Sequence, residues 1–248
     1  ADIVRMMNQG RVVTERFTIP EGLNRWQIRD LLDEAKWVSK NDFDNLCDDQ
    51  VFLKAQGVNQ PNCEGVIFPE TYTFARGVTA KTIFQRIIKT YHAAYKAVTA
   101  GGTGPLGFSE IEFLTLASIV EKETGVPTER RQVASVFINR LNRSIRLQTD
   151  PTVIYGITKG EKTLGRGLRR SELDRKTPWN TYRIDGLPPT PIANPGQASI
   201  EAVLNPEDTN FLFFVANGTG GHIFAETLNQ HNANVKKWRA IEAGKAKK

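Results

Sequence analysis

Two carboxylates at the end of an apolar stretch are the side chains of this sequence best suited to acid–base chemistry. Glu121 and Glu123 follow residues 114–120, which are apolar except for one Thr and one Ser. Burial disfavours the charged form of a carboxyl group, so a carboxyl on a packed face is expected to have a raised pKa. A raised pKa suits a general acid, which must still hold its proton near neutral pH.

The element that positions these carboxylates is predicted to be a helix that begins near residue 110. Ser109 and Glu112 have the Ser-x-x-Glu spacing of a capping box, and Gly125 and Pro127 favour the end of a helix. A second apolar helix is expected from about residue 127 to residue 141.

Helical periodicity does not choose between the two carboxylates. Glu121 lies seven and four residues after Leu114 and Ala117, and Glu123 lies in the same relation to Leu116 and to an isoleucine. A glutamate near a helix end is also commonly solvated or paired in a salt bridge.

A series of uncommon strings resembles the YceG-like family, and the strings occur in the same order. The first is ASIVEKET at residues 117–124, and LQTDPTVIYG follows at residues 147–156. Other matching strings lie at residues 133–141, 180–182, 186–189, 192–196, 213–216 and 220–224. The resemblance runs from about residue 64 to residue 232, and it is looser before that.

The resemblance implies an endolytic murein transglycosylase, which cleaves the β-1,4 bond between N-acetylmuramic acid and N-acetylglucosamine inside a peptidoglycan strand. In this reaction the C6 hydroxyl of the muramic acid attacks C1 and gives a 1,6-anhydro end without water. Glu121 is expected to protonate the leaving oxygen and then to accept the C6 hydroxyl proton. Glu123 is expected to orient Glu121 or to pair with Arg140.

Gln148 and Asp150 are the next candidates for the site. The Gln148 amide is able to hold the N-acetyl group of a sugar. Asp150 precedes Pro151, which biases its backbone towards an extended shape, and its carboxylate is expected either to bind substrate or to cap a turn. If Asp150 faced Glu121, two carboxylates would make true hydrolysis possible, and the protein would be a muramidase.

A polar and aromatic segment supplies further candidates for substrate binding. Asn180, Thr181 and Tyr182 combine hydrogen-bonding groups with an aromatic face that suits a sugar ring, although the same residues also suit a structural loop. His222, in the string GGHIF, is another candidate, but a single histidine is more often structural. His92 and His231 lie on predicted helices and receive no role.

The fold class expected is α+β, with a small N-terminal module and a larger mixed α/β catalytic domain. Residues 1–62 contain a strand at 11–19, the turn at Pro20 and Gly22, and helices that begin at Asn24 and Asn41. This order resembles a LysM-like module, which binds glycan, and a spacer domain without a ligand is the alternative. Residues 63–248 form the expected catalytic domain, with a helix at 79–98, irregular chain at 150–196, a hairpin after residue 210 and a last helix.

The net charge and the two cysteines limit the partners, metals and cofactors that the sequence leads us to expect. The net charge is +6 and the pI is near 9.3, which favour an anionic partner such as a cell wall, lipid headgroups or nucleic acid. No nucleic-acid module accompanies the charge, so no nucleic acid is expected. Cys47 and Cys63 form no metal-binding spacing, so no metal or cofactor is expected, and they are either a disulfide or two thiols.

The surroundings of the protein follow from the same resemblance. No stretch of about 18 apolar residues is present, and the chain starts without a methionine. The resemblance implies a transmembrane anchor upstream of this chain, which would hold it at the periplasmic face of the bacterial inner membrane, close to the cell-wall synthases.

Two other classes of function compete with the transglycosylase. A wall-binding protein without catalysis would need only the N-terminal module, and a nucleic-acid binder is favoured only by the net charge. The sequence contains no Gly-x-Ser-x-Gly, no His-Glu-x-x-His and no Gly-rich phosphate loop.

Overall fold

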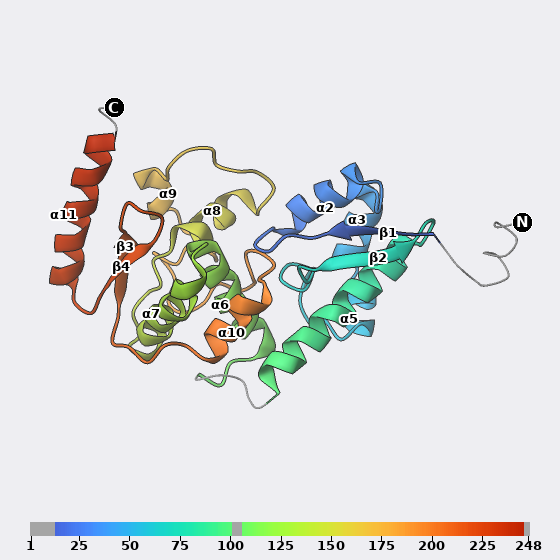
Figure 1. Ribbon diagram of the computed structural model, residues 1–248, viewed down its shortest axis with the longest axis horizontal. Helices are drawn as coiled ribbons and strands as arrows, with labels where there is room; N and C mark the ends of the chain where they lie inside the picture. Colours follow the sequence, from blue (N-terminus) through green and yellow to red (C-terminus); the bar gives the residue numbers. More distant parts are fainter. Residues whose placement is uncertain (1–12, 101–105, 246–248) are drawn as a thin grey trace, which may run out of the picture.

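The computed structural model describes residues 13–100 and 106–245 of the chain. They form a mixed α+β fold that is mostly helical and contains two small sheets of two strands each (Figure 1). No helix within those two ranges is long and apolar enough to cross a membrane.

The first group of elements combines an antiparallel sheet with four helices. Its members are β1 (Thr14–Thr18), α2 (Arg25–Glu34), α3 (Lys40–Asp48), α4 (Gln50–Ala55), β2 (Thr71–Ala75) and α5 (Ala80–Thr99). Aromatic rings fill the space between these helices, because Phe43 of α3 and Phe52 of α4 both pack edge-on against Phe84 of α5.

The boundary of this group differs from the division predicted at residue 62. β2 lies beyond that residue, yet it pairs with β1, with Thr14 opposite Ala75 and Thr18 opposite Thr71. α5 then packs against α3. The first group therefore extends beyond residue 62, because its sheet is complete only when β2 has been added.

The helix caps of this group agree with the sequence in part. Asn24 caps α2 in a capping box with Gln27, as predicted. α3 begins after Ser39 and not at Asn41, because the Ser39 hydroxyl accepts a hydrogen bond from the first turn. Asp49 starts the separate helix α4, so the expected second helix is in fact two helices.

Cys47 and Cys63 form a disulfide, with their Cα atoms 4.8 Å apart. Both cysteines are buried. The bond joins α3 to the segment that leads into β2, and it settles the question that the sequence left open.

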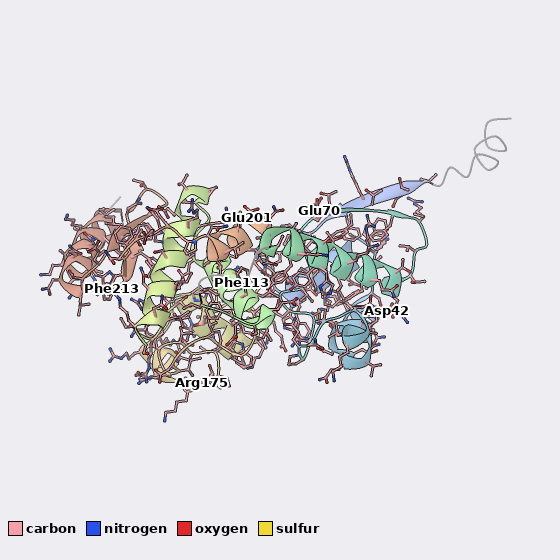
Figure 2. The ribbon with its side chains drawn as sticks, turned by 90° about the horizontal axis from the view of Figure 1, so that it is seen from below. Asp42, Glu70, Phe113, Arg175, Glu201 and Phe213 are labelled. Atoms are coloured by element: carbon pink, nitrogen blue, oxygen red, sulfur yellow. A yellow bond between two sulfur atoms is a disulfide. The ribbon has the colours of Figure 1, made fainter. Side chains whose placement is uncertain are left out.

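The second group of elements surrounds one buried helix. Its members are α6 (Glu110–Glu123), the 3-10 turn η1 (Pro127–Glu129), α7 (Arg130–Asn142), α8 (Asp150–Thr158), α9 (Arg170–Asp174), α10 (Gln197–Leu204), β3 (Phe213–Ala216), β4 (His222–Ala225) and α11 (Leu228–Lys245). Residues 113–120 of α6 are all buried, and Figure 2 shows the first of them, Phe113, among the helices. α6 packs against α7, α8 and α10, so it is the scaffold for side chains at its end.

The segment that was expected to be irregular, residues 150–196, contains α8 and α9. Pro151 lies in the first turn of α8, where a missing N–H is tolerated. Asp150 is consequently helical, and Thr149 is the extended residue before it. The predicted hairpin is confirmed, with Ala216 of β3 opposite His222 of β4.

Candidate active site

Glu121 and Glu123 occupy the last turn of α6 but face different neighbours. Successive residues of a helix are about 100° apart, so residues separated by two positions point to nearly opposite sides. Glu121 faces α10 and the first group of elements, whereas Glu123 faces the start of α8. The structure therefore separates the two carboxylates that periodicity left in competition.

The Glu121 side chain is committed to contacts within the protein. Its Oε2 accepts hydrogen bonds from the Ser199 hydroxyl at 2.7 Å and from the Gly196 N–H at 3.2 Å. Its Oε1 lies 3.9 Å from the Arg130 guanidinium, and the side chain is only 7% exposed. A Cβ placed on Gly22 would lie 3.4 Å from Cγ of Glu121, so the turn before α2 closes this side.

Glu123 lines a cavity of about 420 Å³ in the second group of elements. Three of the residues predicted to bind substrate line the same cavity, namely Gln148, Asp150 and Tyr182. The structure thus gathers these candidates around Glu123, and Glu121 is not among the residues that line this cavity.

Thr149 fixes the Glu123 carboxylate through a hydrogen bond from its hydroxyl. Thr149 is itself held by Thr181, whose hydroxyl accepts the Thr149 N–H at 3.0 Å. The hydroxyls of Thr181 and Thr152 lie 2.8 Å apart and extend this buried network. Thr181 therefore positions the residue that positions Glu123, and it is not free to bind a sugar as predicted.

Asn180 is also internal. Its amide donates to the carbonyl oxygens of Leu173 and Arg175, at 3.0 and 2.6 Å, and its Oδ1 accepts the Tyr182 N–H at 2.9 Å. The residue is 1% exposed. The prediction that Asn180 binds substrate does not agree with this geometry, because its polar atoms already hold the loop that presents Tyr182.

Tyr182 and Asp150 form a pair on the cavity wall. The Tyr182 hydroxyl donates to Oδ1 of Asp150 at 2.7 Å. Burial, together with the nearby Asp150 and Glu123 carboxylates, raises the pKa of Tyr182, so its hydroxyl stays protonated as a donor. Asp150 is exposed and begins α8, which leaves its second oxygen directed to solvent or ligand.

Arg140 lines the cavity, and pairing with it was one of the two roles expected of Glu123, the other being to orient Glu121. Its guanidinium instead donates to the carbonyl oxygens of Leu212 and Leu147, at 2.6 and 3.0 Å, and more weakly to the Gln148 side chain at 3.4 Å. Gln148 adopts a positive φ of 51°, which is uncommon for a residue other than glycine. Arg140 therefore holds the strained turn at Gln148 that brings the neighbouring Thr149 to Glu123.

His222 lies beside the cavity and does not line it. Its ring Nδ1 is 2.8 Å from the Glu129 carboxylate, and its backbone N–H donates to the same carboxylate at 2.8 Å. His231 of α11, which was given no role from the sequence, does line the cavity and stacks on Phe213; nothing in the helical pattern of α11 indicates this.

The pKa of Glu123 is raised. Burial is the largest cause and the charge of Asp150 adds to it, while the Thr149 hydrogen bond and His222 act in the opposite direction. One carboxyl that tends to keep its proton and a second, exposed carboxylate therefore share one cavity. Such a pair is suited to acid–base work on a glycosidic bond.

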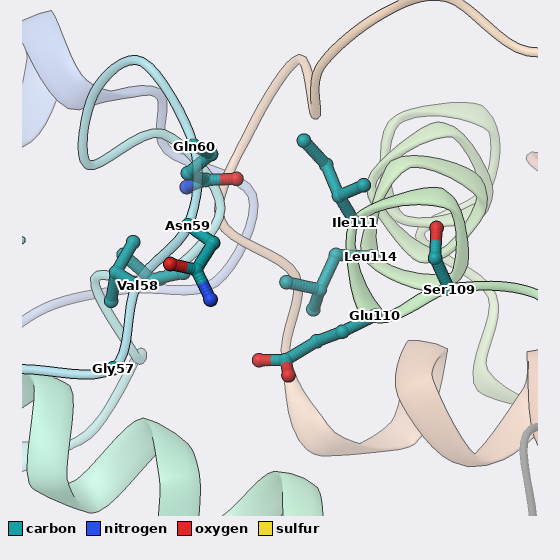
Figure 3. Close-up of a pocket in the computed structure, with 9 residues that line it drawn as sticks. Gly57, Val58, Asn59, Gln60, Ser109, Glu110, Ile111 and Leu114 are labelled. Atoms are coloured by element: carbon teal, nitrogen blue, oxygen red, sulfur yellow. The ribbon is translucent and has the colours of Figure 1, made fainter. Parts of the chain in front are cut away.

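A further cavity, of about 180 Å³, lies between the two groups of elements (Figure 3). One wall is the loop at Gly57 and Gln60, and the other is the start of α6 at Glu110 and Leu114. The Glu110 carboxylate accepts a hydrogen bond from the Tyr91 hydroxyl of α5. This cavity is a seam between the packed groups, with its one carboxylate already partnered.

Comparison with known proteins agrees with the arrangement of these elements. The model of the YceG-like family matches residues 1–237. The chain belongs to the YceG-like family. A solved structure of a YceG-like protein from Listeria monocytogenes is similar, with a TM-score of 0.75 and 36% identity over 94% of this chain and 80% of that chain.

Curated relatives of this YceG-like chain are named endolytic murein transglycosylases. The relative from Bacillus subtilis is 34% identical over 242 residues, which are 90% of this chain and 65% of the relative. The relative from Streptococcus pneumoniae strain D39 is 31% identical over 182 residues, which are 69% of this chain and 31% of the relative. The chain thus spans slightly less than two thirds of the first relative's length.

Proposed function

We propose that this chain is the catalytic part of an endolytic murein transglycosylase in which Glu123 is the single general acid and base. The observation that carries the proposal is the shared cavity of Glu123, Asp150 and Tyr182, in a member of the YceG-like family. The names of the relatives supply the substrate, peptidoglycan.

The chemistry requires one proton to leave the enzyme and one to return. Burial and the Asp150 charge favour the protonated form of Glu123, so it donates to the glycosidic oxygen as the bond to N-acetylglucosamine breaks. The resulting carboxylate then accepts the proton of the C6 hydroxyl as that oxygen attacks C1 of the muramic acid. The product end is a 1,6-anhydro ring, and no water is consumed.

The other side chains of the cavity bind and orient. Asp150 and Tyr182 offer an acceptor and an aromatic face to the sugar, and Asp150 also stabilises positive charge that develops at C1. The exposed Gln148 amide suits the N-acetyl group. Thr149 holds the carboxyl of Glu123 in place, which leaves its other oxygen for the substrate.

A muramidase is the second candidate function, and the position of Asp150 favours it. Glu123 and Asp150 line one cavity, and most glycosidases that hydrolyse their substrate use two such carboxylates. In that case Asp150 would act as the nucleophile or activate a water, and the product would be a reducing end that carries an added water.

Glu121 remains the alternative acid and base, and one experiment decides among these possibilities. Purified peptidoglycan is digested with the wild-type chain, Glu123→Gln and Glu121→Gln, and the products are weighed by mass spectrometry. We expect 1,6-anhydro ends from the wild type and from Glu121→Gln, and a loss on the order of 100- to 10,000-fold from Glu123→Gln. Circular dichroism of each variant controls for folding.

Other outcomes of the digestion have clear meanings. Full activity of Glu123→Gln with loss in a folded Glu121→Gln returns the role to Glu121. Products with an added water indicate a muramidase. No cleavage by the folded wild type favours a wall-binding protein.

The cellular role is part of the proposal. Cleavage within nascent strands would end their elongation at the periplasmic face of the membrane, near the cell-wall synthases, with an anchor upstream of this chain. The pairing of β1 with β2 around the helices α2, α3 and α4 supports a LysM-like role in glycan binding for the first group of elements, although it contains one helix more than the two expected from the sequence.

A further inference from the structure

Another cavity, of about 380 Å³, lies on the other side of the α6 end and is called the second cavity below, with the Glu123 cavity as the first. It is bounded by the start of α2 at Asn24 and Gln27, by α8 at Ile154 and Tyr155, and by the loop that follows α8. Both groups of elements therefore build it, and the proposed transglycosylase reaction assigns it no role.

Neighbouring residues of the same two elements, α6 and α8, line the two cavities. Lys122 lines the second cavity while the adjacent Glu123 lines the first, and Pro151 lines the second while the adjacent Asp150 lines the first. The two cavities thus lie on neighbouring faces of the end of α6 and the start of α8, which places the second cavity near a ligand in the first.

The charges of the second cavity select an anion. Lys122, Lys162 and Arg166 line it, and none of its lining residues is acidic. Arg166 is compensated by two hydrogen bonds to Glu172, at 2.9 and 2.6 Å. The Lys122 ammonium donates to the Gly22 carbonyl at 3.0 Å, which leaves two of its three N–H groups for a ligand. Lys162 is exposed.

Apolar side chains complete the cavity, and hydrogen bonds hold the start of the loop beside it. Ile154, Leu164 and Ile192 provide aliphatic wall beside the lysines. Asn24 donates from its amide to the Gly160 carbonyl at 3.0 Å, and the Trp26 indole donates to the Lys159 carbonyl at 2.9 Å. The first group of elements therefore holds the start of the loop, at residues 159 and 160.

We propose that this second cavity binds the acidic stem peptide carried by the muramic acid unit in the Glu123 cavity. The inference rests on the proposed function, because it requires a peptidoglycan strand there. A stem peptide offers small methyl side chains and free carboxylates on one branch of the sugar. These match an aliphatic wall that is flanked by two lysine ammonium groups.

The test compares strands that carry stem peptides with strands from which an amidase has removed them. The readout is the ratio of the two cleavage rates, each measured below saturation. We expect the wild type to favour peptide-bearing strands about tenfold, as one charge-assisted contact supplies. In Lys162→Glu this ratio falls to about one. Lys89→Glu, an equal charge change on the exposed face of α5, keeps the wild-type ratio.

Equal cleavage of both strands by the wild type would overturn the stem-peptide site and leave the transglycosylase intact. So would an identical preference in Lys162→Glu. If neither strand is cleaved, the proposed function fails. A binding measurement then tests the stem-peptide site in the second cavity on its own. A free stem tetrapeptide is then titrated into the wild type and Lys162→Glu by NMR. Binding that only Lys162→Glu loses supports the site, and absent or equal binding overturns it.

Discussion

Glu121 and Glu123 are two residues apart on α6, and their carboxylates are held by different partners on nearly opposite sides of the helix. Ser199 of α10 donates to Glu121 at 2.7 Å, and Thr149, just before α8, donates to Glu123. The Glu121 side of α6 faces the first group of elements, and the Glu123 side lines a cavity. Because the two carboxylates have different partners, single substitutions can test their roles separately.

Replacement of Glu121 by alanine is expected to reduce stability and not catalysis. The change leaves the Ser199 hydroxyl and the Gly196 N–H without their partner, which should cost about 1–3 kcal/mol in the free energy of unfolding. Urea denaturation of Glu121→Ala and Glu123→Ala measures the difference. A stable Glu121→Ala that has lost cleavage would contradict this interpretation of the side chain.

Thr149→Val is expected to change the pH profile as well as the rate. The Thr149 hydrogen bond lowers the pKa of Glu123, so its removal raises that pKa further. Because the reaction starts from protonated Glu123, the alkaline limb of kcat/KM should move to higher pH, while kcat falls about tenfold as the carboxyl loses its orientation. Thr149→Ser keeps the hydroxyl and serves as the control. An unshifted limb in Thr149→Val would argue against a positioning role.

Much of the scaffold was predictable from the sequence, since the α6 and α5 helices and the β3–β4 hairpin have strong local patterns. The choice between Glu121 and Glu123 was not, because apolar residues precede both at helical spacing. It depends on Thr149, which lies 26 positions from Glu123 along the chain, and on Ser199, which lies 78 positions from Glu121. Local pattern alone also left open whether Asn180 would bind substrate or hold a structural loop.

Asp150→Asn is expected to move the alkaline limb of kcat/KM in the direction opposite to that expected for Thr149→Val. The Asp150 charge raises the pKa of Glu123, so neutralising it lowers that pKa. The alkaline limb of kcat/KM should shift to lower pH, and kcat should fall about 10- to 100-fold as a charge that faces the reacting sugar is lost. Rates across pH 5–9 on one soluble glycan measure both effects. An unchanged profile would mean that Asp150 is not electrostatically coupled to the acid.

Removal of the Cys47–Cys63 disulfide is expected to weaken the first group of elements. The bond closes a separation of 16 residues, for which chain entropy predicts a contribution of about 3 kcal/mol. The double replacement Cys47→Ser and Cys63→Ser should lower the urea midpoint, and reductant should lower that of the wild type alone. Identical midpoints for the wild type with and without reductant would show that the bond adds no stability.

Glu64 is expected to make stability fall as the pH rises. Burial raises its pKa to about 7, although Arg25 and Asn194 donate hydrogen bonds to Oε1 and Tyr155 to Oε2. The folded state thus binds the proton more tightly than the unfolded state, whose pKa is near 4.5. This contribution is fully present below about pH 4.5 and is lost as the pH rises to about 7. The loss amounts to about 3 kcal/mol at 1.36 kcal/mol per pKa unit. Urea unfolding at several pH values should show a smaller decline for Glu64→Gln, and parallel curves for the two proteins would refute the assignment.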